Sequence, residues 1–217
     1  MSSFVLLFLY ALVATIFHMT SIAIAGQLAG ESLRKLSVGV GMVIGQWHKL
    51  ELRILPIGAA TVFKHSEGEN LAEDDTQGAF NHLARWRQTL ICLAGSTCLL
   101  VFAILVLGEP GWQAFLQGYR QIFIGGLSPL SDAQNYLQQG MRFVMEASTL
   151  QGFALICAKL AAFILLPFPG NLGWNVLAIW FKPQSEPGRL YTICAWIQVL
   201  LWISWAIALG YAIYVQH

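Results

Sequence analysis

His18 is the residue of this sequence whose type and position first raise the question of chemistry. It is the one histidine in an uncharged apolar run from residue 4 to residue 25. A histidine on a lipid-facing helix is costly, so we expect His18 to face protein or water. Residues four apart share a helix face, and the residue four positions on is Ile22, which cannot bind a metal. We therefore predict a hydrogen-bonded interior residue and not a metal ligand.

A second place with unusual residues is the stretch 166–175, which reads Leu-Pro-Phe-Pro-Gly-Asn-Leu-Gly-Trp-Asn after an apolar run that begins at Ala154. Pro167, Pro169 and Gly170 should break a helix, because proline removes a backbone donor and clashes with the preceding turn. In lipid, a break is tolerated where protein or a water-filled cavity satisfies the freed backbone groups. The sequence predicts an unwound segment of the kind that marks a site or a packing junction.

Membrane helices are the elements expected to position these residues. The 217-residue chain is 57% hydrophobic and 11% charged, with a mean hydropathy of +0.62, whereas soluble domains carry about 25% charged residues. We predict an α-helical integral membrane protein of the bacterial inner membrane, with one domain over residues 1–217. Four spans, each near the ~20 residues needed to cross a bilayer, are expected at 4–25, 89–107, 149–167 with a broken continuation to 180, and 190–214. The first has no basic residue before its apolar run, so we expect a retained helix and not a signal peptide.

Positive charges predict the orientation of these spans. Seven Lys and Arg residues lie in segment 27–88 and two lie in segment 181–189, while segment 108–147 has two. The positive-inside rule then places the first two segments in the cytoplasm, and the third segment and both termini on the other side. A net charge of +1 gives no basic patch, so no nucleic-acid partner is expected. The four cysteines all lie in apolar runs without zinc-type or redox-type spacing.

The predicted loops have some structure of their own. Residues 50–54 alternate between apolar and polar, and residues 61–63 can run back as a second strand after Pro56 and Gly58. We expect a small β-element that lies against or dips into the cytoplasmic face. The acidic stretch 65–77 is predicted to be a solvated loop, since no calcium-loop pattern fits it. Outside, we expect an amphipathic interfacial helix, a turn and a second helix from Ser131.

The order of these pieces resembles the site-2 protease family of intramembrane zinc metalloproteases. In that family a first helix carries His-Glu-x-x-His, and two strands follow with Gly-x-Gly-Pro and Leu-Pro-Leu-Gly-Gly-Tyr-Val. A Trp-Arg approach then leads into a helix with Ala-Gly-Pro-x-x-Asn, and Asn-Leu-Leu-Pro-x-Pro-x-Leu-Asp-Gly comes later. The similar segments of this chain, in the same order, are 18–22, 39–42, 55–59, 85–87, 94–96 and 165–173. The resemblance covers the chain from about Phe4 to Tyr214 and implies the membrane core of that family.

The departures from the family pattern fall on its chemistry. The general-base Glu is Met19 here, the second His is Ile22 and the ligand Asp is Leu172. A shift of one residue would bring Asn171 to the Asp position, but a neutral amide is a poor zinc ligand. A catalytic zinc needs three protein ligands and a water. The resemblance therefore implies no catalytic residue, no metal and no cofactor. The former-cleft positions are His18, Met19, Ile22, Asn171, Leu172 and Gly173.

Two expectations follow for this former cleft. Met19, Ile22 and Leu172 should fill the old metal cavity and pack the first span against the third. Four polar residues could hydrogen-bond across the cleft: Thr20, Ser21, Asn171 and Asn175.

These observations together predict a pseudoprotease. It would act in the lipid bilayer as a non-catalytic subunit or scaffold that binds another integral membrane protein or its transmembrane helix. The first alternative is a divergent intramembrane metalloprotease with unrecognised ligands. The second is a small channel or transporter that uses the helix break and Lys159 as a pathway.

Overall fold

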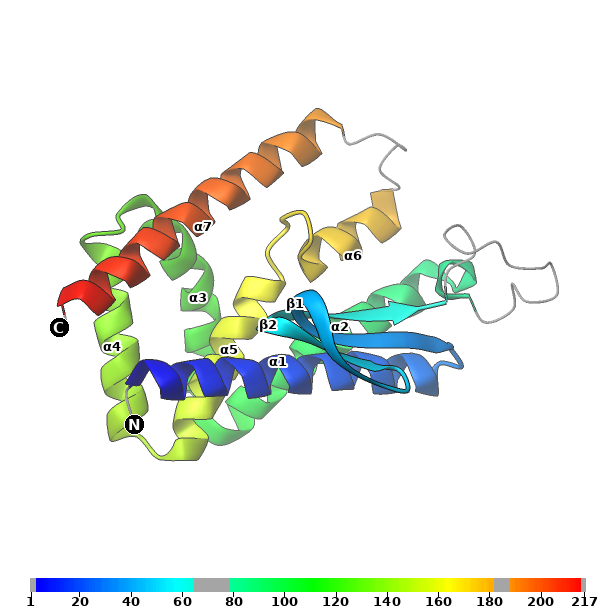
Figure 1. Ribbon diagram of the computed structural model, residues 1–217, viewed down its shortest axis with the longest axis horizontal. Helices are drawn as coiled ribbons and strands as arrows, with labels where there is room; N and C mark the ends of the chain where they lie inside the picture. The colour runs from blue at the N-terminus through cyan, green and yellow to red at the C-terminus, as the bar shows by residue number, and fades with distance from the viewer. Residues whose placement is uncertain (1–2, 65–78, 182–187, 216–217) are drawn as a thin grey trace. The chain divides into compact units, whose positions relative to one another are not determined.

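The protein is mostly helical, with one small sheet, in the computed structural model (Figure 1). The structure describes residues 3–64, 79–181 and 188–215, and the predicted acidic loop 65–77 lies outside these residues. In chain order the elements are α1 (Ser3–Leu28), β1 (Leu33–Trp47), β2 (Leu50–Phe63), the short 3-10 helix η2 (Phe80–His82), α2 (Arg85–Leu107), α3 (Glu109–Leu127), α4 (Asp132–Glu146), α5 (Thr149–Ile164), α6 (Leu172–Phe181) and α7 (Arg189–Val215).

Three helices among the described residues are long and apolar enough to cross a membrane. They cover Val5–Leu28, Arg85–Leu107 and Arg189–Val215, which correspond to the first, second and fourth predicted spans. The third predicted span is divided between α5 and α6, which have 16 and 10 residues. At about 1.5 Å per residue, α5 alone is shorter than a bilayer core. The helical, apolar character is compatible with the predicted membrane protein.

The described chain divides into two compact units. Unit 1 comprises Met1–Ala11 and Leu99–His217, and unit 2 comprises Leu12–Cys98. Unit 2 therefore holds most of α1, the sheet and the first part of α2, while unit 1 holds α3 to α7. This division matters for the candidate residues, because His18 belongs to unit 2 and the stretch 166–175 belongs to unit 1.

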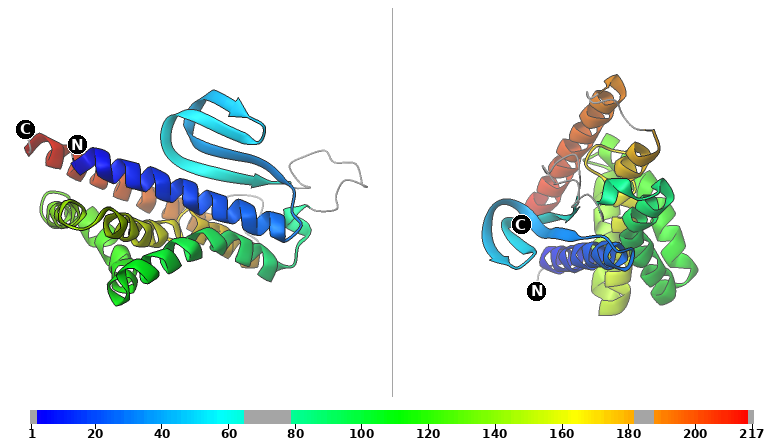
Figure 2. Two further views of the ribbon diagram at one scale, coloured as in Figure 1. Left: turned by 90° about the horizontal axis from the view of Figure 1, so that it is seen from below. Right: turned by 90° about the vertical axis from the view of Figure 1, so that its right-hand side faces the viewer.

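The sheet of unit 2 is larger than the sequence predicted. β1 and β2 pair antiparallel, with several register shifts. Leu36 pairs with both Thr61 and Leu50, so the start of β1 has neighbours on both sides. The two long strands accordingly bend into a sheet four segments wide, whose far end curls back in Figure 2. Both strands predicted from the residue pattern, 50–54 and 61–63, lie in β2, and within β1 only the family resemblance implied a strand, at 39–42. Gly39 and Gly41 of β1 have positive φ, which an alternating strand pattern does not reveal.

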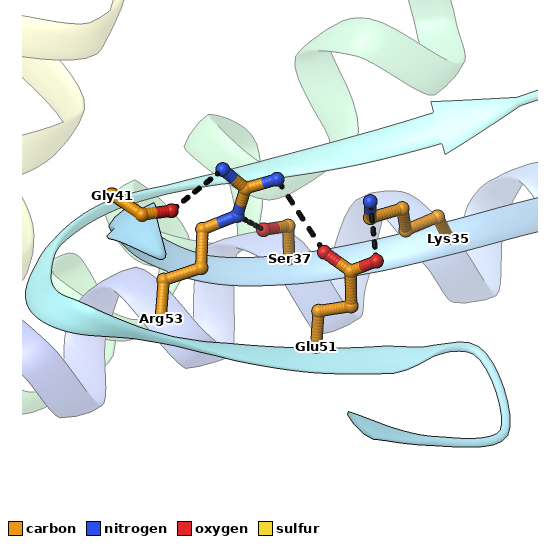
Figure 3. Close-up of polar contacts among 5 residues, drawn as sticks. All are labelled: Lys35, Ser37, Gly41, Glu51 and Arg53. Atoms are coloured by element: carbon orange, nitrogen blue, oxygen red, sulfur yellow. Dashed lines mark hydrogen bonds and ion pairs between the residues drawn. The ribbon is translucent and has the colours of Figure 1, made fainter. Parts of the chain in front are cut away.

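A cluster of charged residues ties the strands of this sheet together (Figure 3). Glu51 is 7% exposed and forms ion pairs with Lys35 and Arg53. Arg53 also donates from Nε to Ser37 Oγ over 2.9 Å and from Nη1 to the Gly41 carbonyl oxygen over 3.1 Å. The hydrogen bond from Lys35 is the main cause that lowers the pKa of Glu51. The cluster links both strands and stabilises their register.

Side chains of the sheet also pack on α1 within unit 2. Thr61 Oγ1 donates a hydrogen bond to Met19 Sδ over 3.1 Å. The ring of Phe63 lies so close to Gly26 that a Cβ at position 26 would come within 2.5 Å of two of its carbons. Phe63 in turn stacks on Phe80, with ring centroids 5.5 Å apart. The strand that carries Thr61 and Phe63 is therefore held along the second half of α1.

In unit 1, α3 is the helix against which the others pack. It carries Gly111, Gly118 and Gly125 at a spacing of seven residues. A Cβ at each position would come within 2.7 Å of the end of α2, of α5 and of α7, respectively. The helix predicted for this segment is confirmed, as are the turn and the second helix, α4. Its close packing against three other helices goes beyond what an amphipathic helix on a membrane surface requires.

Candidate functional site

His18 lies at a close contact between α1 and α2. Its side chain is 1% exposed. On α2, Gly95 faces it, and a Cβ at that position would lie 2.4 Å from His18 Nδ1 and 2.5 Å from the His18 carbonyl oxygen. Small residues such as the Ala-Gly-Ser run of α2 allow backbones to approach in this way. The prediction that His18 faces protein is thus confirmed.

The predicted hydrogen bonding of His18 is only partly realised. Its Nδ1 atom is shielded from solvent and has no hydrogen-bond partner of normal geometry among the described residues, although the Gly95 backbone is close enough to influence it. The Oγ atom of Ser96, the next residue on α2, is likewise shielded and without a partner. Two polar side chains are therefore buried at this contact at a cost that a hydrogen bond does not offset.

The neighbouring positions of α1 carry no metal-binding group. Ile22 is buried, and Met19 is half-buried with its sulfur already engaged by the Thr61 hydroxyl. Thr20 is exposed, and the Ser21 hydroxyl donates to the Phe17 carbonyl oxygen over 2.8 Å on its own helix. These side chains surround His18 with apolar or locally bonded groups.

The helix break lies where the sequence predicts it. In Figure 1, α5 ends, the chain passes through a loop and a helix resumes as α6. The Phe163 carbonyl would accept a bond from residue 167 in a continuous helix, but Pro167 has no N–H. Asn171 replaces that donor, because its Nδ2 atom donates to the Phe163 oxygen over 3.0 Å. Gly170 adopts a positive φ of 86°, which turns the chain towards α6.

Gly173 sits directly against the end of α5. A Cβ at position 173 would lie 2.2 Å from the Leu165 carbonyl oxygen and 2.6 Å from that of Leu166. The loop itself is packed, since Leu166 and Phe168 are buried together with Leu201 of α7. The break is therefore a closed packing junction within unit 1, one of the two roles expected for it.

Leu172 and its polar neighbours are placed by the structure within their own unit. Leu172 is the first residue of α6 and is half-buried, while Asn175 is exposed. Asn171 bonds within its own segment, as Ser21 does within α1. Whether these side chains also hydrogen-bond across a former cleft stays a prediction, since Ser21 belongs to unit 2 and Asn171 to unit 1. That Met19, Ile22 and Leu172 converge to fill one cavity stays a prediction, since they belong to different units.

A zinc ion does not fit the residues at these positions. In residues 3–64, 79–181 and 188–215, no group of three or more His, Cys, Asp or Glu side chains is placed to hold a metal. His18 is the one ligand-type residue on its stretch of α1, and a catalytic zinc needs three protein ligands. What the arrangement offers instead is a tight helix contact with two unpaired polar atoms.

One hydrogen bond between two polar side chains of unit 1 was not predicted from the sequence. Lys159 of α5 donates from Nζ to Gln121 Oε1 of α3 over 2.7 Å. Lys159 stands out as the single charge in its apolar run, but nothing in the pattern of α3 distinguishes Gln121 from its neighbouring glutamines. The contact joins residues 38 positions apart and depends on tertiary packing.

The sequence was also compared with known proteins. No protein-family model matches it, and no curated protein matches it.

Proposed function

We propose that this chain is a non-catalytic integral membrane protein with a site-2-protease-like framework, which binds another membrane protein or its transmembrane helix. The observation that carries the proposal is the state of the α1 positions at which the family places its chemistry. His18 is kept and buried against Gly95, whereas Met19 and Ile22 stand where the base and the second ligand would be. On this proposal, the packing framework of the family is kept at these positions and its catalytic groups are replaced.

Three further features support this proposal. A Gly-containing strand and an Ala-Gly helix follow α1 in the family order, and the helix break after α5 comes at the position of the family's third ligand. Three apolar helices are long enough to cross a membrane. In the proposed topology, the segments 27–88 and 181–189 are cytoplasmic and both termini are on the other side of a bacterial inner membrane.

Binding of a partner is proposed because a packed, non-catalytic membrane core retains one general use, which is association with other helices. Helices in lipid associate through close packing and interhelical hydrogen bonds, and this chain exposes large apolar side chains along α7 such as Trp196 and Trp202. These exposed side chains form an apolar surface on α7 against which a partner helix can pack.

The test is to crosslink native membranes, isolate the full chain and identify the proteins that are bound to it. The wild type is compared with a variant whose contact between α1 and α2 is disrupted. One membrane protein in a fixed ratio to the chain is expected with the wild type. The matched variants are Gly95→Leu, which should disrupt the contact of α1 and α2, and Gly210→Leu, where nothing lies within 4 Å of an added Cβ. Recovery of no membrane protein with the wild type contradicts the proposal, and so does proteolysis of a partner's transmembrane segment by the purified chain.

A further inference from the structure

Lys159 presents a charge inside unit 1 that forms no ion pair with an acidic side chain in residues 3–64, 79–181 and 188–215. It is the one Lys, Arg, Asp or Glu in the 16 residues of α5. Its stem passes over Gly118 of α3, where an added Cβ would lie 3.7 Å from Lys159 Cδ. Its Nζ atom donates to Gln121 Oε1 over 2.7 Å, and the side chain is partly exposed. The ammonium group is thus held in place and remains accessible.

The acidic residues of α3 and α4, which are Glu109, Asp132 and the exposed Glu146, form no ion pair with Lys159. Glu109 at the start of α3 accepts a hydrogen bond from Gln113, and Asp132 at the start of α4 accepts one from Ser128. The ion pairs found among the described residues belong to the sheet of unit 2. An ammonium group has three hydrogen-bond donors and a unit positive charge. The amide oxygen of Gln121 accepts one hydrogen bond and, being neutral, does not balance the charge.

In the proposed topology the third span begins at Thr149, and the position of Lys159 along α5 then places its charge deep in the membrane. It follows the first residue of α5 by ten positions, which is about 15 Å of helix rise and half of a bilayer core of about 30 Å. Charged residues at such a depth are rare, and they pair with an opposite charge or mark a functional site. Lipid phosphates lie at the surface of the bilayer, so a carboxylate on another helix is the counter-charge that reaches this depth.

We infer that Lys159 docks an aspartate or glutamate in the transmembrane helix of the partner, an inference that rests on the proposed function. Gln121 orients the ammonium group, and Gly118 leaves the room through which the lysine stem passes. The partner is thereby defined by its chemistry as a membrane helix with one acidic residue near its middle. Charge complementarity selects this helix over the apolar helices of the same membrane.

The experiment uses the full chain reconstituted in uncharged phosphatidylcholine vesicles. The probes are synthetic leucine-rich transmembrane helices with one central Glu, Gln or Leu, and association is measured by energy transfer between labels. The wild type should bind the Glu helix about tenfold more tightly than the Lys159→Met variant does, as expected for one interhelical polar contact. Lys159→Arg should retain the binding, and Arg120→Met, which removes an exposed cation of α3, should leave it unchanged.

Three results would overturn the inference. One is equal binding of the Glu helix to the wild type and to Lys159→Met when both variants have the same thermal midpoint. Another is an equal loss with Arg120→Met, which would indicate a general charge effect. The third is displacement of the Glu helix when phosphatidylglycerol replaces part of the phosphatidylcholine, which would make a lipid headgroup the ligand. If a partner from native membranes binds Lys159→Met as well as the wild type, the inference fails while the proposed function stands.

Discussion

At the contact of α1 and α2 in unit 2, His18 Nδ1 and Ser96 Oγ are buried and have no hydrogen-bond partner in the part of the chain that the structure describes. At the break between α5 and α6 in unit 1, Asn171 supplies the donor that Pro167 lacks. The third shielded atom without a partner among the described residues, Glu31 Oε2, also belongs to unit 2. Unit 1 thus satisfies its irregular backbone, while unit 2 keeps polar side chains at a cost to stability.

This difference in hydrogen bonding indicates that the break in unit 1 has a structural role. The break at residues 165–171 is held by the Asn171 side chain, which bonds to the Phe163 carbonyl oxygen at the end of α5. Unpaired polar atoms at a helix contact are what remains when a site loses its ligands and keeps its scaffold, as the proposed function has it. Substitutions in the two regions should therefore have opposite effects on the free energy of unfolding.

The largest effect is expected for Gly173→Ala in unit 1. The new Cβ would lie 2.2 Å from the Leu165 carbonyl oxygen, and because the neighbour is backbone, the break itself must shift. We expect a loss of at least about 2 kcal/mol, measured as thermal unfolding in detergent. Gly210→Ala on α7 is the control, since the site is open and alanine favours a helix over glycine by roughly 1 kcal/mol. Equal midpoints for both variants would show that the break is loosely packed.

A smaller loss is expected for Asn171→Leu. The substitution keeps the size of the side chain and removes the bond to the Phe163 carbonyl oxygen, which retains a second donor in the Leu166 N–H. The expected cost is about 1.5 kcal/mol. Asn175→Leu, at an exposed position of α6, should change stability little. If the two variants behave alike, the side chain of Asn171 does not stabilise the break.

Two serines give a direct comparison of the regions. Ser204 of α7 donates to the Gly126 carbonyl oxygen in unit 1, so Ser204→Ala should cost about 1 kcal/mol. Ser96→Ala removes a buried hydroxyl that has no partner and should be neutral or slightly stabilising. Chemical denaturation in the same detergent measures both. A larger loss with Ser96→Ala than with Ser204→Ala would contradict the contrast between the units.

The smallest effect concerns Glu31 and appears as a pH dependence. Burial raises the pKa of Glu31, so the folded protein holds this proton more tightly than the unfolded chain does. Its contribution to stability is therefore present in acid and is lost as the pH rises from about 4.5 through the raised pKa. Glu31→Gln should remove this loss, and unfolding midpoints between pH 4 and pH 8 should decline less than in the wild type.

Glu51 provides the opposite sign within the same unit. Its pKa is lowered by Lys35, so its contribution is present above about 4.5 and is lost as the pH falls through the lowered pKa. Glu51→Gln should accordingly flatten the acid side of the profile and leave the neutral side alone. The same change of slope in both variants would show that the two carboxyl groups are not in different environments.

The parts of the structure that can be predicted from the sequence are those that depend on residues close together along the chain. The apolar runs predict α1, α2 and α7, and two prolines with a glycine predict the break after α5, because each feature acts within one turn of backbone. The residue pattern does not predict β1, because its partners lie in β2, and only the family resemblance implied a strand there, at 39–42. Tertiary packing likewise decides that Gly95 touches His18 and that Gln121 meets Lys159, so neither contact is visible along the chain.

Zinc content tests the central claim most directly. The claim is that the chain keeps the framework of a zinc protease and has lost the residues that bind the zinc. Purified wild-type protein should contain no stoichiometric zinc after washing. The variant Met19→Glu/Ile22→His/Leu172→Asp restores the base and the two missing ligands, and it should bind about one zinc per chain if the framework is that of the family. Adding His18→Ala to this variant should abolish that zinc. About one zinc in the wild type, or none in the folded triple variant, would contradict the account.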